Sequence, residues 1–297
     1  MRRWGWAFFG CSRFPKDVSE FELLRAFTFS DRERRDIRAV FRVRYRLAAA
    51  LQLGFLRLTG TALASVAYVP TVVLHHLGRQ FRGPTPDLAT LRALYRRRRT
   101  RFEHRRWAIE YLGLCRLDGR GEGALTEELR QRTHGTLSRS RLEQHARDWL
   151  QGRSYLIPGP RRIAQRVRQV VQAVEADDHR ELRRAITAEQ AQRVLEKLLA
   201  PRAGGVMTAV EWLRRPPKRR SLRTMRELHD KYRWLERLVG HYRFTGIPRQ
   251  RQLVYARRFR RRRTAALGAL RAPRRELEAL CFITATLATV TDDLLRL

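Results

Sequence analysis

"TRFEHRRWAIEYLGL", residues 100–114, interleaves arginines with aromatic side chains. On a helix of about 3.6 residues per turn, Ala108 and Ile109 lie on one broad apolar face, which Phe102 is expected to extend on one side. Arg106 lies opposite, with a glutamate about one turn away on each side, at spacings that favour ion pairs. The stretch predicts an amphipathic core helix with a self-neutralised outer face, which leaves only the preceding run Arg96–Arg101 without acids.

Similar helical periods run through residues 194–199 and 222–239, and four helix starts carry a capping box. The boxes begin at Ser19, Ser30, Ser140 and Thr187, each with Glu or Gln at the required spacing. Alternating strand patterns of useful length and Gly-rich phosphate loops are missing. We predict an all-α fold of successive small helical bundles with helix-turn-helix-like elements.

Breaks rich in glycine and proline divide the chain, among them "DGRGEG" at 118–123 and "IPGP" at 157–160. The predicted domains are an N-terminal helical DNA-binding domain over 1–84, a second over 87–200 with a helix-turn-helix-like segment at 124–174, and a C-terminal helical region over 205–297.

The chain of 297 residues has 64 Lys and Arg against 29 Asp and Glu, a formal net charge of +35. A charge of this size is tolerable when a polyanion neutralises it, and nucleic acid is the commonest such partner. Attraction to an anionic membrane surface and a compositional preference for arginine stay open as alternatives. We expect double-stranded DNA as the partner.

Three isolated cysteines, Cys11, Cys115 and Cys281, fit neither a disulfide framework nor zinc-ligand spacing. They indicate a reducing, cytoplasmic location, and we expect no cofactor and no metal site. Residues 58–78 carry no Asp, Glu, Lys or Arg, but glycine, proline and histidine interrupt them. This stretch predicts a buried helix, a loop and a second helix rather than a membrane span, so we expect no membrane partner.

Two helices supply the candidate DNA-contacting residues. Residues 124–152 read as helix, turn and helix, and the second helix of such a pair reads the major groove from its first residues. After "IPGP", a narrow apolar stripe is surrounded by Arg and Gln, with no acid until Glu175. Arg and Gln side chains can bond to guanine and adenine edges, although a solvated face without a partner is the alternative. The candidates are Arg139, Arg141, Gln144, Arg161, Arg162, Gln165, Arg166, Arg168 and Gln169.

Several stretches occur in an order that resembles the N-terminal part of the Tn-three family of replicative transposases. They are "SRFPKDVSEFELLRAFTFSDRERRDI", "RLAAALQLGFLRLTG", "TRFEHRRWAIEYLGL", "YLIPGPRRIAQRV" and "RRELEALCFITATLATVTDDLLRL". One departure is Tyr45-Arg46-Leu47-Ala48, where the family has a more polar Asn-Arg-Leu-Gly element. The resemblance implies recognition of the terminal inverted repeats of a transposon. It also implies that the ribonuclease-H-like catalytic domain is not part of this chain, because the match ends at Leu297.

The acidic residues agree with a non-enzymatic role. Two-metal phosphoryl transfer needs carboxylates that converge from different elements, whereas Asp177-Asp178 are expected at a helix end and Asp292-Asp293 within a terminal helix. We therefore predict no catalytic residues. Further partners are full-length transposase or a second copy of the chain. Two alternatives stay open. One is an RNA-binding or ribosome-associated structural protein, and the other is one piece of a complete transposase.

Overall fold

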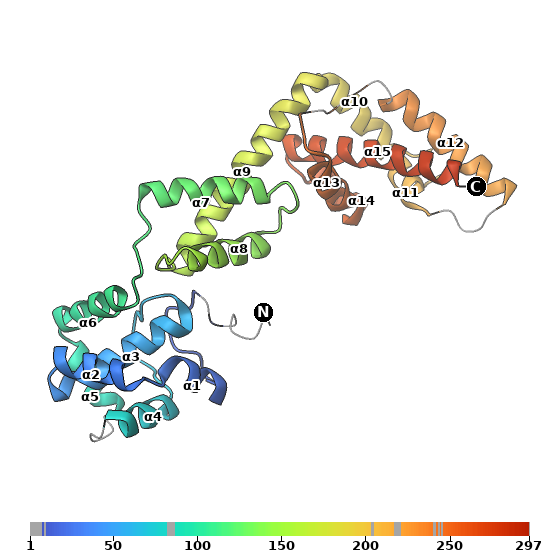
Figure 1. Cartoon of the computed structure of the whole chain (residues 1–297). Helices are drawn as coiled ribbons and strands as arrows, with labels where there is room; N and C mark the ends of the chain where they lie inside the picture. Colours follow the sequence, from blue (N-terminus) through green and yellow to red (C-terminus); the bar gives the residue numbers. More distant parts are fainter. Residues whose placement is uncertain are drawn as a thin grey trace. The chain divides into compact units, whose positions relative to one another are not determined.

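The computed structural model describes residue 8 and residues 10–81, 87–202, 205–216, 221–239, 242, 244 and 246–296. Within these residues every regular element is an α-helix, apart from two isolated bridges, Cys115 with Tyr155 and Pro201 with Thr208 (Figure 1). The all-α prediction is confirmed.

The helices group into two compact units. The first unit holds residues 1–129 and 143–167, and the second holds 130–142 and 168–297. Six helices lie wholly in the first unit: α1 (Glu20–Phe27), α2 (Asp31–Val40), α3 (Val43–Thr59), α4 (Thr71–Phe81), α5 (Leu88–Tyr95) and α6 (Arg98–Tyr111). Three have residues in both: α7 (Gly119–Arg132), α8 (Arg139–Gly152) and α9 (Pro160–Ala185). The second unit adds α10 (Ala188–Leu199), α11 (Ala209–Arg214), α12 (Leu222–Val239), α13 (Arg249–Arg261), α14 (Thr264–Gly268) and α15 (Ala272–Leu295).

This division follows the packing of the helices. It differs from the predicted boundaries 1–84, 87–200 and 205–297, which were placed at glycine and proline breaks. Those three domains stay a prediction.

Helix α3 is the centre of the first unit, in contact with α1, α2, α4 and α6. Its residues from Ala48 to Leu56 are all buried, and Gln52 is the one amide side chain among otherwise apolar residues in this stretch. Gly54 permits the closest of these contacts, because an added Cβ would collide with the Phe27 ring. The helix ends at Gly60, whose φ of 66° is the left-handed conformation that glycine adopts freely.

The uncharged stretch 58–78 forms the end of α3, a loop and the start of α4, as predicted. Among the residues that the structure describes, no helix combines enough length with enough apolar character to cross a membrane.

Three predicted capping boxes, at Ser19, Ser30 and Thr187, are present with both reciprocal hydrogen bonds. The fourth differs, because α8 begins at Arg139 and Ser140 therefore lies inside its first turn. Thr208 forms a further capping box with Glu211, at the same spacing in the sequence as the predicted ones.

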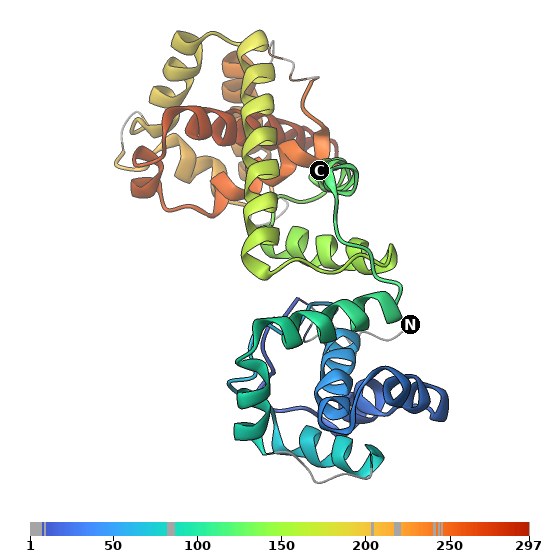
Figure 2. The same ribbon diagram turned by 90° about the vertical axis from the view of Figure 1, so that its left-hand side faces the viewer.

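Helix α15 is the centre of the second unit, packed against α13, α12 and α10; Figure 2 shows it in dark red. Its residues from Glu276 to Ile283 are buried, including two carboxylates. Glu278 receives Arg262 and Arg274 at 2.9 and 2.8 Å, and Glu276 pairs with Arg183. Part of the large positive charge of the chain is therefore neutralised by glutamates inside this unit.

A buried polar contact lies in the core of the first unit. The Tyr95 hydroxyl donates its hydrogen to the Ala48 carbonyl at 2.9 Å. His104 Nδ1 lies 3.1 Å from the same hydroxyl oxygen, so the Nδ1–H group is the donor and the oxygen is the acceptor. His104 is 2% exposed, and burial lowers the pKa of its imidazole to about 4. The folded chain therefore holds this ring neutral.

We expect the stability of the first unit to fall as the pH drops from 6.5 towards 4. The imidazole takes up a proton near pH 6.5 in the unfolded chain but only near pH 4 in the folded one, so acid favours unfolding. The full difference corresponds to about 3 kcal/mol. Urea unfolding followed by circular dichroism measures it. His104→Gln should lose most of this pH dependence, whereas the exposed His75→Gln should keep it; equal pH dependence in both variants would contradict the assignment.

Candidate nucleic-acid interface

Helix α8 presents two of the candidate residues at its start. Arg139 and Arg141 are exposed in its first turn, and neither has an ion-pair partner within the described part of the chain. Gln144 is half-buried, and its amide donates to Asp148 Oδ1 at 2.7 Å on the same helix. The arginines are therefore available to a ligand, whereas Gln144 is already engaged.

Helix α9 carries the predicted apolar stripe, which is buried. The stripe consists of Ile163, Val167, Val170, Val171 and Val174. Arg161, Gln165 and Arg168 follow one another at turn spacing on the opposite side and are exposed, as is Gln169 beside them. None of these four has a hydrogen-bond or ion-pair partner for its side chain in the described ranges.

Two other candidates on α9 are not free, which corrects the expectation that this helix lacks acidic neighbours. Glu122 of α7 pairs with Arg162 and, at 2.7 Å, with Arg166. The glycines of "DGRGEG" predict a break in the chain, which gives no sign that Glu122 lies on a helix beside α9. The structure instead starts α7 at Gly119, with the Asp118 carboxylate accepting from the Gly121 N–H at 2.7 Å. Arg162 and Arg166 thus fasten α9 to α7.

The starts of α8 and α9 differ electrostatically from those of the capped helices. Helices α1, α2, α10 and α11 have acidic residues in the first turn, which complement the positive end of the helix dipole. Helices α8 and α9 have no acid there and carry arginines instead. Arginines at this end repel the dipole, and an anion such as phosphate would relieve that repulsion.

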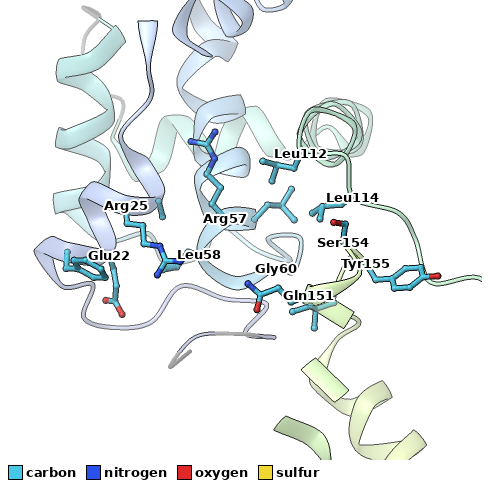
Figure 3. A pocket seen from close by; sticks show the side chains of 14 residues that line it. Glu22, Arg25, Arg57, Leu58, Gly60, Leu112, Leu114, Gln151, Ser154 and Tyr155 are labelled. Atoms are coloured by element: carbon cyan, nitrogen blue, oxygen red, sulfur yellow. The ribbon is translucent and has the colours of Figure 1, made fainter. Parts of the chain in front are cut away.

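Hydrogen bonds to the end of α3 hold the segment that precedes α9. Ile157 N–H donates to the Gly60 carbonyl at 2.8 Å, and the Thr61 hydroxyl donates back to the Ile157 carbonyl at 3.3 Å. Beside this connection lies a hollow of about 360 Å³, which Leu58, Leu112 and Gln151 line together with Arg25 and Arg57 (Figure 3). The segment "LIPG" therefore anchors the point at which α9 begins.

The basic run at 256–264 is only partly open to solvent. Arg258 pairs with Glu175 at 2.7 Å and Arg262 with Glu278, so both serve the packing of the second unit. Arg257, Arg260 and Arg261 are exposed.

The paired aspartates occupy structural positions. Asp177 binds Arg130 and Arg180, and Asp178, which is 1% exposed, lies 2.7 Å from Arg251 Nε and accepts from the Tyr255 hydroxyl at 2.7 Å. Burial raises the pKa of Asp178, and its two donors oppose that shift. Both aspartates lie within α9 rather than at a helix end, which corrects that expectation. Asp292 and Asp293 lie in α15 as predicted. In the described ranges, no three His, Cys, Asp or Glu residues are grouped so that they could hold a metal ion.

Comparison with known proteins places the chain among proteins related to transposition. Residues 10–170, more than half of the chain, match the family described as "Domain of unknown function (DUF4158)". The transposase for insertion sequence element IS1071 in transposon Tn5271, from Comamonas testosteroni, is 30% identical over 295 residues, which cover 99% of this chain and 30% of that protein. The transposase for transposon Tn501, from Pseudomonas aeruginosa, is 26% identical over 284 residues, which cover 94% of this chain and 28% of that protein.

The chain thus spans about 30% of the length of each of these two relatives. The relationship to transposases expected from the sequence landmarks is confirmed. The chain belongs to the DUF4158 family and is related to transposases along nearly its whole length.

Proposed function

We propose that the chain binds double-stranded DNA and recognises the terminal inverted repeats of a transposon. The observation that carries the proposal is the exposed row of Arg161, Gln165 and Arg168 on α9, which has no acidic partner among the residues that the structure describes, in a chain related to transposases. Arginine binds phosphate and guanine, and glutamine pairs with adenine, so this row combines affinity with sequence reading.

The surroundings of α8 support a helix-turn-helix role for α7 and α8. Leu142, Ala146 and Leu150 are buried on one side of α8, while Arg139 and Arg141 stay exposed at its start. A recognition helix enters the major groove with these first residues. Arg162 and Arg166 are bound to Glu122, and Gln144 is bound to Asp148, so we leave these three out of the proposed DNA-contacting residues. The remaining candidates are Arg139, Arg141, Arg161, Gln165, Arg168 and Gln169.

In this proposal the described helices recognise DNA and perform no strand cleavage. The ion pairs of Asp177 and Asp178 support this role, because both carboxylates already neutralise arginines. The chain is expected to share transposon ends with full-length transposase or with a second copy of itself.

A competition experiment tests sequence recognition. A labelled duplex carrying the inverted repeat of the element that encodes the chain is bound at physiological salt and challenged with unlabelled repeat or scrambled duplex. Specific sites commonly bind at least about 1,000-fold more tightly than nonspecific DNA, so the repeat should displace the label at far lower concentration. Equal displacement by both competitors would reduce the interaction to nonspecific electrostatics. Displacement by structured RNA alone would favour the RNA-binding alternative.

A further inference from the structure

A second basic surface lies in the first unit, where α3 and α6 begin. Arg42 is the N-cap residue of α3 and Arg97 that of α6, and neither makes a side-chain capping bond. Neither helix has an acid in its first turn. The neighbouring helices α1, α2 and α5 are capped by Ser19, Ser30 and Asp87.

These two helix starts meet at one hollow of about 420 Å³. Phe41, Arg42 and Tyr45 line it from the α2–α3 side, and Thr100 and Trp107 from α6. Arg42 and Thr100 belong to the first residues of their helices, so the basic starts of α3 and α6 border the same opening.

The walls of the hollow are aromatic. Phe41 and Trp107 meet edge to face, with ring centroids 5.1 Å apart at 89°. His104 also lines the hollow, and its ring centroid lies 4.9 Å from that of Phe41 and 5.7 Å from that of Tyr45, edge to face in both pairs. Phe41, Tyr45 and Trp107 are half-buried, and each lines the hollow.

The charged residues that line the hollow are Arg42 and Arg106 with Glu103 and Glu110, and further arginines at the starts of α3 and α6 lie close to them in the sequence without lining it. Two acids line it, but Glu103 receives Arg99 at 2.8 Å and Glu110 faces Arg106 at 3.6 Å. Nearby basic side chains are exposed and have no acidic partner among the residues that the structure describes: Arg42, Arg44, Arg96, Arg97 and Arg98. The Arg44 guanidinium also lies over the Tyr45 ring, 4.6 Å from its centroid.

We propose that this hollow binds the base of an unpaired nucleotide while the arginines at the starts of α3 and α6 hold its phosphates. Aromatic walls with exposed arginines at the starts of the adjoining helices suit single-stranded nucleic acid, in which bases stack on side chains and phosphates contact positive charge. A base inside an intact duplex is stacked on its neighbours and cannot enter a hollow, whereas an unpaired or extruded base can. This site is separate from the duplex-reading residues of α8 and α9 and adds a different ligand.

Substitutions at Tyr45 test the stacking directly. Binding of the full chain to a short labelled single-stranded DNA of mixed sequence is followed by fluorescence anisotropy, beside an RNA strand of the same sequence that shows which strand is preferred. Tyr45→Leu keeps apolar volume but removes the ring, and affinity should fall roughly ten-fold. Tyr45→Phe keeps the ring and should bind as the unchanged chain does. Tyr68→Leu, at a 48% exposed tyrosine of the same unit that does not line the hollow, is the matched control.

Photo-crosslinking locates the base. A 5-iodouracil placed at one unpaired position should cross-link to Phe41, Tyr45 or Trp107, identified by mass spectrometry. Unchanged single-strand affinity in Tyr45→Leu, or cross-links only to other segments, would overturn the proposal. A second variant separates this proposal from the proposed recognition of duplex DNA. Arg161→Ala with Arg168→Ala should weaken binding of the inverted-repeat duplex, while the affinity for single-stranded DNA and the cross-link at the hollow should remain.

Discussion

Replacing Asp178 with alanine is expected to lower the stability of the second unit by about 3–5 kcal/mol. Asp178 is the buried acceptor for Arg251 and for the Tyr255 hydroxyl, and Arg251 is itself only 7% exposed. Without the carboxylate, the described part of the chain leaves the buried Arg251 guanidinium one hydrogen-bond partner, the Thr133 hydroxyl, 3.2 Å from Nη1. An uncompensated buried charge is among the most costly defects a folded chain can carry.

The neighbouring residue provides a matched control. Asp177→Ala removes the same charge from the same helix, but Asp177 is 28% exposed and its partners Arg130 and Arg180 are 49% and 76% exposed. Exposed pairs contribute about 1 kcal/mol or less. Urea unfolding of both variants compares the two sites, and an equal loss would show that Arg251 and Tyr255 do not depend on Asp178.

Replacing Arg161 and Arg168 together with alanine is expected to weaken duplex binding by roughly ten-fold to 100-fold. Both side chains are exposed, point away from the buried stripe of α9 and have no acidic partner within the described residues. If each holds one phosphate, the slope of log affinity against log salt should become shallower by about two. Titrations of labelled duplex at several salt concentrations measure both quantities.

The control is Arg162→Ala with Arg166→Ala, which removes the same number of charges from the same helix. These arginines already bind Glu122, so long-range attraction to DNA should weaken similarly but no direct contact should be lost. We expect a smaller loss of affinity and an unchanged preference for the inverted repeat. Identical losses in the two double variants would show that only net charge matters and would remove the reading role from α9.

The helical period predicted the buried side of α9 and most of the buried side of α6. In α6, Ala108 and Ile109 are buried, and Arg106 faces Glu110 at 3.6 Å as the spacing indicated. The prediction was wrong for Phe102, which is 52% exposed, and for Glu103, which binds Arg99 instead of Arg106. Phe102 lies at the edge of the apolar face, where a small rotation of the helix decides whether a side chain contacts protein or solvent. Glu103 lies on the opposite face, where Arg99 and Arg106 are both about one turn away, so spacing alone does not choose its partner.

The candidate site was predictable only in part. Arg161, Gln165, Arg168 and Gln169 are exposed on α9 opposite its buried stripe, which a periodic pattern shows. The shared partner of Arg162 and Arg166 was not predictable from the sequence, because Glu122 is distant from them along the chain and lies in a segment whose glycines predict a loop. The hollow beside Tyr45 was equally hidden, since its walls come from α3 and α6, which are joined through two further helices.

The sequence by itself determined the helices, their buried faces and the relationship to transposases, since these depend on residue spacing and on order along the chain. Only the tertiary structure decided which charges remain free for a ligand. Arg168 stays open while Arg166 is bound to Glu122, and Asp178 is enclosed while Asp177 reaches solvent. The physical reason is that ion pairing and burial depend on distances between helices, which packing sets and which no local pattern of residues contains.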